Sequence, residues 1–112
     1  MEFIESKSGD FSIISPVGKL DVTGQKQLES RLLAMIEEGN NKIVIDCAHL
    51  TYVSSSGLRV LLIALKKANA SGGTLRLSSI HDNVREIMII AGFSSIFNIF
   101  DTPEEAANLN ID

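Results

Sequence analysis

The hydrophobic pattern begins with two short strand-like runs. Residues 3–7 and 11–15 are rich in Phe, Ile and Ser, and they flank the turn-forming residues Ser8, Gly9 and Asp10. Gly and Asp between β-branched or aromatic residues are typical of a β-hairpin. Pro16 follows and has no N–H to donate to a neighbouring strand, so we expect the second strand to end there.

Apolar residues at three- and four-residue spacing predict three helices along the chain. The first covers 25–38, with Asp21 or Thr23 as its N-cap. The second covers 56–70, and the third runs to about residue 91 after a cap at Ser79 or Asp82. The residues expected to face the core are, helix by helix, Leu28, Leu32, Met35 and Ile36; Leu58, Leu61, Leu62 and Leu65; and Val84, Ile87, Met88 and Ala91.

Short apolar runs between these helices predict strands. In the segment 42–46 the apolar residues 43–45 are consecutive rather than alternating, which indicates a strand buried on both faces, central and parallel to its neighbours. Residues 47–53 are interpreted as a loop, 74–78 as another strand and 95–100 as a short last strand or extended segment. Thr102-Pro103 followed by Glu105 is typical of a helix start with a capping box, and this helix is expected to end near Leu109.

The element order is therefore β-β-α-β-α-β-α-β-α. It predicts an α/β fold: one domain over residues 1–112, with a mixed sheet made of an N-terminal hairpin plus right-handed parallel crossovers, packed with about four helices. In such sheets, ligands and partners meet the loops at the carboxyl ends of the parallel strands. Ser54-Ser55-Ser56 is expected at that place, after the central strand, with the loop that carries Asp21 beside it.

The three serines at the start of the second helix exceed what a helix start requires. One side-chain oxygen is enough to cap an orphan N–H, so the remaining hydroxyls are free for modification. A phosphate there would gain hydrogen bonds and a favourable helix field, and it would add roughly −1.5 to −2 charge. All three can equally be plain cap and loop residues. Gly57 follows them, and its missing side chain would let another chain approach.

Composition narrows the function classes. The 112 residues are 45% apolar and 21% charged, which is typical of a globular domain, and the formal net charge of −4 argues against nucleic acid as the main partner. The longest apolar run, residues 60–65, is too short to span a bilayer, and the acidic N-terminus does not resemble a targeting segment. We therefore expect a cytoplasmic protein without direct membrane insertion. The single cysteine, Cys47, excludes an internal disulfide and is interpreted as a small buried hydrophobe.

The sequence lacks the residue combinations that are typical of an enzyme active site. It contains no nucleophile with an accompanying His and carboxylate, and no phosphate-binding loop. His49 and His81 are far apart and lack cysteines at ligand spacing, so we expect neither a metal nor another cofactor. Asp46 is interpreted as closing the loop after its strand, with a role near the acceptor serine as the lesser alternative.

At this point the chain resembles the STAS domain, in the form found in bacterial anti-sigma factor antagonists. The resemblance covers nearly the whole chain and depends on the order and spacing of its pieces. Those pieces are Gly18-Lys19-Leu20-Asp21, Ile43-Val44-Ile45-Asp46, Tyr52-Val53-Ser54-Ser55-Ser56-Gly57-Leu58, Gly72-Gly73-Thr74-Leu75-Arg76-Leu77, Ile90-Ala91-Gly92-Phe93 with Ile96-Phe97, and Glu104-Glu105-Ala106.

The resemblance implies a partner switch controlled by phosphorylation. Members of the family bind an anti-sigma factor that is also a serine kinase, phosphorylation ends this binding, and a serine phosphatase reverses it. The family motif is Asp-Ser-Ser-Gly with its first serine as acceptor, which falls on Ser55 here. Ser54 replaces the aspartate, so Ser54 and Ser56 remain alternative acceptors. The partner-binding surface is expected at Asp21, Ser54, Ser56, Gly57, Leu58 and Arg59.

A different use of the same fold is the main alternative. STAS domains also serve as unphosphorylated scaffolds and as cytoplasmic parts of transport or other regulatory assemblies. A scaffold would carry no phosphate in cells and would keep full binding after Ser55→Ala. The identity of the partner and the oligomeric state stay open at this level.

Overall fold

The computed structural model describes residues 1–108 of the chain and contains one mixed sheet and four helices. The α/β prediction is confirmed, and the observed order is β-β-α-β-β-α-β-α-β-α. The elements are β1 (Glu2–Ser8), β2 (Phe11–Leu20), α1 (Val22–Glu37), β3 (Lys42–Asp46), β4 (Leu50–Val53), α2 (Ser55–Ala70), β5 (Thr74–Ser78), α3 (Asp82–Ile90), β6 (Ile99–Phe100) and α4 (Pro103–Asn108).

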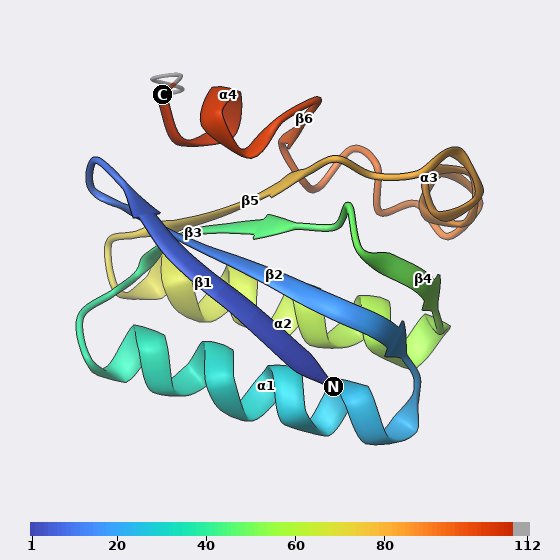
Figure 1. The fold of residues 1–112 in the computed structure, drawn as a ribbon, viewed down its shortest axis with the longest axis horizontal. Helices are drawn as coiled ribbons and strands as arrows, with labels where there is room; N and C mark the ends of the chain where they lie inside the picture. The colour runs from blue at the N-terminus through green and yellow to red at the C-terminus, as the bar shows by residue number, and fades with distance from the viewer. Residues whose placement is uncertain (109–112) are drawn as a thin grey trace.

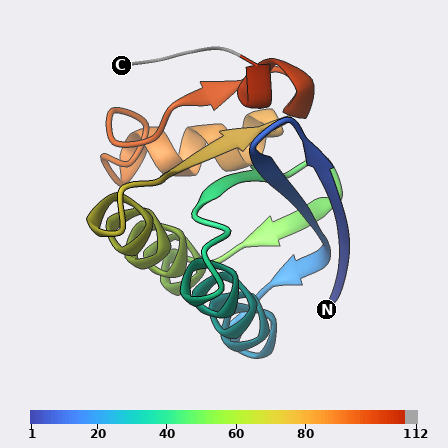
Figure 2. The same ribbon diagram turned by 90° about the vertical axis from the view of Figure 1, so that its left-hand side faces the viewer.

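The sheet has the order β1-β2-β3-β5-β6, with β4 paired to β2 beside this path. β1 and β2 form the predicted antiparallel hairpin, and the remaining pairs are parallel. α1 and α2 lie side by side on one face of the sheet, and the short α4 covers part of the other face (Figures 1 and 2). Within residues 1–108, no helix combines the length and the apolar character needed to cross a bilayer.

The prediction that Pro16 ends the second strand is wrong, because β2 continues to Leu20. β2 pairs with β1 from Phe11 to Val17, and Pro16 lies opposite Phe3. On its other side, β2 pairs with β3 up to Ile14 and with β4 only from Gly18. Pro16 therefore lies in the gap between two partners, where a missing N–H breaks no ladder hydrogen bond.

The predicted loop over 47–53 contains a strand that the sequence pattern did not reveal. β4 occupies Leu50–Val53, and only its two end residues are buried. It is aligned by a long-range partner, since Leu20 of β2 lies opposite Val53. The strands predicted at 42–46 and 74–78 are confirmed with their expected bounds.

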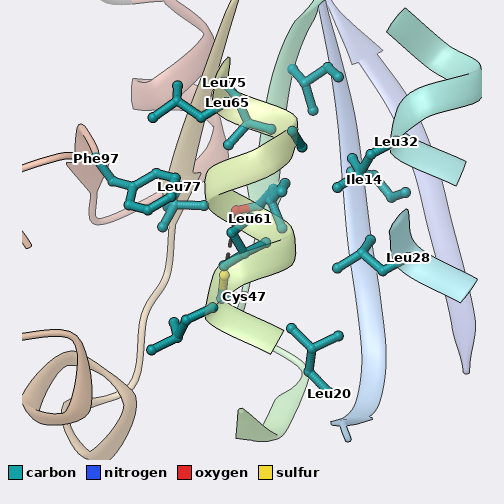
Figure 3. Packing of buried hydrophobic residues seen from close by; sticks show 14 of the residues in the cluster. Ile14, Leu20, Leu28, Leu32, Cys47, Leu61, Leu65, Leu75, Leu77 and Phe97 are labelled. Carbon is teal, nitrogen blue, oxygen red and sulfur yellow. Dashed lines mark hydrogen bonds between the residues drawn. The ribbon is translucent and has the colours of Figure 1, made fainter. Parts of the chain in front are cut away.

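The main core lies between the sheet and the pair α1 and α2 (Figure 3). The apolar stripes predicted for these helices supply it, with Leu28, Leu32, Leu58 and Leu61 at most 3% exposed. A smaller cluster under α4 joins Phe11, Ile13, Val44 and Ala106.

Arg76 ties α4 to the second face of the sheet. Its guanidinium lies 4.7 Å from the centre of the Phe11 ring, and its Nη1 donates to the carbonyl oxygen of Ala106 at 2.6 Å. These contacts with an aromatic face and a helix carbonyl offset part of the free-energy cost of removing the guanidinium from water.

The C-terminal third of the chain differs most from the elements predicted from the sequence. α3 has His81 as its N-cap residue without a side-chain hydrogen bond, so neither Ser79 nor Asp82 caps it. Val84 and Met88 are buried as predicted, but Ile87 and Ala91 are exposed. The strand expected over 95–100 is reduced to β6. The Thr102 cap is confirmed, since Thr102 Oγ1 accepts from Glu105 N at 3.1 Å, while the expected end near Leu109 lies outside the described residues.

Candidate functional site

Two helices begin next to each other at one end of the sheet. β2 and β4 are parallel neighbours that end at Leu20 and Val53, and α1 and α2 begin after Asp21 and Ser54. Ser54 N donates to the carbonyl oxygen of Leu20 at 3.1 Å, which joins the two strand ends directly. The expectation that the Asp21 loop lies beside the serine triplet is therefore confirmed, although the strand before the triplet is β4 and not the central β3.

Ser54 is the N-cap of α2, and its hydroxyl is occupied. Its Oγ accepts from Gly57 N at 3.0 Å and donates to the carbonyl oxygen of Leu20 at 3.1 Å. The same Oγ lies 3.1 Å from Ser56 Oγ. Ser54 therefore both caps the helix and anchors its start to the end of β2.

The Ser56 hydroxyl is also engaged. Its Oγ donates to Oε1 of Gln25 in α1 at 2.6 Å. This bond joins the second residue of α2 to the fourth residue of α1. Ser54 and Ser56 together thus form a polar network that connects α2 with both β2 and α1.

Ser55 differs from its two neighbours. It is the first residue of α2, its side chain is exposed, and its hydroxyl makes no hydrogen bond with any residue in 1–108. A kinase can reach such a hydroxyl without first breaking an internal bond. A phosphate on it would lie at the helix end where N–H groups and the macrodipole favour an anion.

Gly57 and Leu58 require a correction, because both are buried. Leu58 is 0% exposed and belongs to the main core. A Cβ added to Gly57 would lie 2.8 Å from Cγ of Leu20, so its small size serves the packing of α2 against β2. The partner surface expected at these two residues is not available in this conformation, and the amphipathic pattern of α2 explains why.

Asp21 caps α1, which is one of the two roles that the sequence allows for this residue. Its Oδ1 accepts from Gly24 N at 2.9 Å and so satisfies the first turn of α1. The residue is nevertheless exposed, and its carboxylate lies on the same end of the sheet as Ser55. Capping and contact with a partner are compatible roles for this side chain.

Two exposed apolar residues at this end of the molecule escaped the sequence analysis. Val22, the first residue of α1, is 63% exposed, and Tyr52 of β4 is 48% exposed. Arg59 is exposed one helical turn after Ser55. The position of Tyr52 next to the serine triplet could have indicated a role at this site. Its exposure, however, follows from β4, a strand that the sequence pattern does not predict. We call Asp21, Val22, Tyr52, Ser55 and Arg59 the helix-start surface.

The neighbouring polar residues have structural partners. The carboxylate of Asp46 accepts from Ser15 Oγ at 3.1 Å and from Ala48 N at 3.2 Å, so it closes the loop after β3. Nε2 of His81 lies 2.7 Å from the carbonyl oxygen of Ala48. No group of three His, Cys, Asp or Glu side chains within residues 1–108 is arranged to hold a metal ion.

Cys47 is buried next to this loop, as predicted. Burial and the charge of Asp46 raise the pKa of its thiol to about 12. A thiol with so high a pKa is protonated at neutral pH and is a poor nucleophile. The residue therefore contributes to packing, and its Sγ contacts the carbonyl oxygen of Ile45 at 3.7 Å (Figure 3).

Comparison with known proteins gives a consistent picture. The family model for the STAS domain matches residues 4–106. A Bordetella bronchiseptica protein named as a candidate anti-sigma factor antagonist, BtrV, is 38% identical over 90 residues, which cover 80% of this chain and 78% of that protein.

Solved structures agree. The crystal structure of a candidate anti-sigma factor antagonist from Thermotoga maritima superposes with a TM-score of 0.87 at 25% identity, covering 93% of this chain and 90% of that one. SpoIIAA, at 21% identity, shares the fold in its unphosphorylated form with a TM-score of 0.75, covering 95% of this chain and 94% of that one. Its phosphorylated form, from Bacillus, has a TM-score of 0.73, covering 94% and 96%.

Proposed function

Because the chain belongs to the STAS domain family, we propose that it is an anti-sigma factor antagonist whose binding is switched at Ser55. The unphosphorylated protein binds an anti-sigma factor that is also a serine kinase, and so releases the sigma factor. Phosphorylation of Ser55 ends this binding, and a serine phosphatase restores it. The protein then acts in the cytoplasm as a regulator rather than as an enzyme.

One observation carries the choice of Ser55. Of the three serine hydroxyls at the start of α2, those of Ser54 and Ser56 are held by Leu20, Gly57 and Gln25, whereas the Ser55 hydroxyl is exposed and makes no hydrogen bond with residues 1–108. Transfer of a phosphoryl group to Ser54 would break the cap of α2. Transfer to Ser55 costs no internal hydrogen bond.

The helix-start surface suits such a switch physically. Val22 at the start of α1 and Tyr52 of β4 supply exposed apolar contact area at the same end of the sheet, as the centre of a protein interface usually requires. A phosphate on Ser55 would bring a hydrated dianion into the contact, and burying unpaired charge is costly. A penalty of about 3 kcal/mol would weaken binding more than a hundredfold.

The proposal needs no change of fold. SpoIIAA has been solved in unphosphorylated and phosphorylated forms, and both superpose on this chain with similar TM-scores of 0.75 and 0.73. Local charge and steric bulk at one surface are sufficient for the switch. The same reasoning assigns Asp21 and Arg59 as polar residues at the rim of the interface, where they influence association more than stability.

Phosphosite mapping by mass spectrometry tests the acceptor. The protein is isolated from its native cells in growth and under stress, as wild type and as Ser55→Ala. We expect one phosphate on Ser55 whose occupancy changes with condition, and none on the Ser55→Ala protein.

Two matched controls make the mapping specific. Ser54→Ala and Ser56→Ala each remove a neighbouring hydroxyl and leave Ser55 in place, so the phosphate should persist in both. A phosphate that is lost only in one of these two variants would contradict the assignment and move the acceptor. A triplet without phosphate in every condition would favour the constitutive scaffold.

A further inference from the structure

Arg59 is a cation of α2 that the fold does not use. Its side chain is exposed, and it makes no hydrogen bond and no ion pair within residues 1–108. Arg31, by contrast, is held by the Glu5 carboxylate at 2.7 and 2.8 Å, and Arg76 donates to the carbonyl oxygen of Ala106. Arg59 is therefore available for an interaction that the unmodified chain does not make in its described part.

The position of Arg59 places it next to Ser55 on the surface of α2. The two residues are four positions apart, and residues at this spacing lie on the same face of a helix, with their Cβ atoms about 5–6 Å apart. A helical side chain also leans toward the N-terminal end of its helix, so the long arginine side chain can reach the turn that contains Ser55. An acid followed by a base four residues later is the favourable order for a helical ion pair.

The helix itself offers Arg59 no acidic partner. α2 contains no Asp or Glu along its 16 residues, and its two lysines lie near its C-terminal end. Asp21 is the acidic residue of the helix-start surface, and its Oδ1 is engaged by Gly24 N at 2.9 Å. A phosphate on Ser55 would therefore bring an anion to Arg59 without displacing one that is already bound.

We propose that the phosphate on Ser55 is bound by Arg59 of the same chain. This inference rests on the proposed function, because it concerns the phosphorylated form of that site. Arginine presents a planar fork of N–H donors that matches two phosphate oxygens, and hydrogen bonds between charged groups are roughly twice as strong as those between neutral groups. The ion pair lies over the first turn of α2, where the helix field also favours an anion.

The ion pair changes the helix-start surface in two ways. Phosphorylation adds a dianion at Ser55, and the contact with this dianion withdraws Arg59 from any acidic group that a partner presents. In the unmodified chain both side chains are exposed, and neither is engaged within residues 1–108. The acceptor serine and the arginine therefore act as one unit, in which a single modification alters two side chains.

Phosphorus-31 NMR titration of the full chain with phosphoserine incorporated at 55 tests the ion pair. A nearby cation stabilises the dianion, so the phosphate should titrate below its ordinary second pKa of about 6. Arg59→Gln should raise the pKa of the phosphate by about half a pH unit, as expected for a solvent-exposed ion pair. Arg59→Lys keeps the charge and should retain part of the lowering.

Lys66→Gln is the matched control, because it removes one positive charge from an exposed site of the same helix, about three turns beyond Ser55. It should leave the pKa of the phosphate unchanged. The proposal is overturned if Arg59→Gln and Lys66→Gln shift this pKa equally, or if neither shifts it. Because the phosphate is incorporated directly, the result does not depend on whether a kinase modifies Ser55 in cells, which the phosphosite mapping decides separately.

Discussion

At the level of single residues, hydrogen bonding is what separates three consecutive serines. Ser54 caps α2, Ser56 bonds to Gln25 of α1, and Ser55 faces solvent. The sequence placed the triplet at a helix start, but it left open which hydroxyl is free. The partners that occupy the other two hydroxyls are Leu20 and Gln25, which lie about 30 residues away in the sequence and are brought to the site by the fold. A local sequence pattern therefore could not identify the free hydroxyl.

Ser54→Ala should destabilise the protein by about 1 kcal/mol, because it removes the acceptor for Gly57 N and the donor to Leu20. Urea unfolding at pH 7 measures this loss. Ser55→Ala is the control, since its hydroxyl makes no hydrogen bond within residues 1–108 and its removal should change the stability by less than about 0.5 kcal/mol. Equal effects of the two substitutions would contradict the distinction between these serines.

Gly57→Ala should destabilise the protein by about 1–2 kcal/mol, although alanine is the better helix former. The added Cβ would lie 2.8 Å from Cγ of Leu20 and 3.0 Å from its carbonyl oxygen. Combining Gly57→Ala with Leu20→Ala removes the first of these clashes. The double variant should therefore lose less stability than the two single losses together. Strictly additive losses would show that Leu20 is not what limits this position.

At the level of elements, the site depends on the pairing between β2 and β4, which the sequence pattern does not predict. β4 has four residues, and its two middle residues are exposed, so it lacks both an apolar run and a clear alternation. The extension of β2 past Pro16 is equally hidden, because a proline is acceptable only where no partner needs its N–H. The buried strands β3 and β5 were predictable, since a short apolar pattern between turn residues, continuous in β3 and alternating in β5, is typical of a strand.

In α3 the hydrophobic pattern predicts more burial than the structure shows. Its apolar residues suggested a wide buried face, and only Val84 and Met88 are buried. Hydrophobic periodicity reports what a helix could bury, not how much of its surface the rest of the chain covers. The exposed isoleucines at 87, 89 and 90 are the part of this helix that the rest of the chain leaves uncovered.

The pairing of β1 with α1 should make stability dependent on pH. Arg31 donates to the Glu5 carboxylate at 2.7 and 2.8 Å and holds the pKa of Glu5 below its ordinary value of 4.5. The pair therefore stabilises the fold above about pH 4.5, and this contribution is lost as the pH falls through the lowered pKa. Both side chains are about one-third exposed, so the contribution should stay below about 1 kcal/mol.

Urea unfolding of the wild type and Glu5→Gln at pH 7 and pH 3 measures this pair. The wild type should be the more stable protein at pH 7, and the difference should shrink at pH 3. Glu2→Gln, at the other exposed end of β1, controls for loss of an acid without an ion pair, since Glu2 has none within residues 1–108. A difference that is constant over this range would contradict the assignment.

At the level of the whole molecule, Cys47 reports how tightly the main core is closed. With its pKa at about 12, only about one thiol in ten thousand is ionised at pH 8. An aromatic disulfide reagent should therefore react with the native protein at least a hundredfold more slowly than with the protein in urea. Labelling at the same rate in both conditions would show that the core around Cys47 opens without global unfolding.

The global architecture was largely accessible from the sequence. One sheet, a hairpin start, parallel crossovers and two helices over a shared core follow from periodicity and turn residues, and the structure has them. The surface was not accessible in the same way. Val22 and Tyr52 became candidates for partner contact, and Leu58 ceased to be one, only after the packing of α1, α2 and β4 was known.

Calorimetric binding of the anti-sigma factor kinase to two forms of this protein tests the central claim most directly. One form has Ser55 unmodified, and the other has phosphoserine incorporated at 55. A third form with phosphoserine at the exposed Ser6 of β1 carries the same charge away from the helix-start surface. The account predicts that phosphoserine at 55 weakens binding at least a hundredfold while phosphoserine at 6 leaves it unchanged. Equal affinity of the forms with and without phosphate on Ser55 would contradict it.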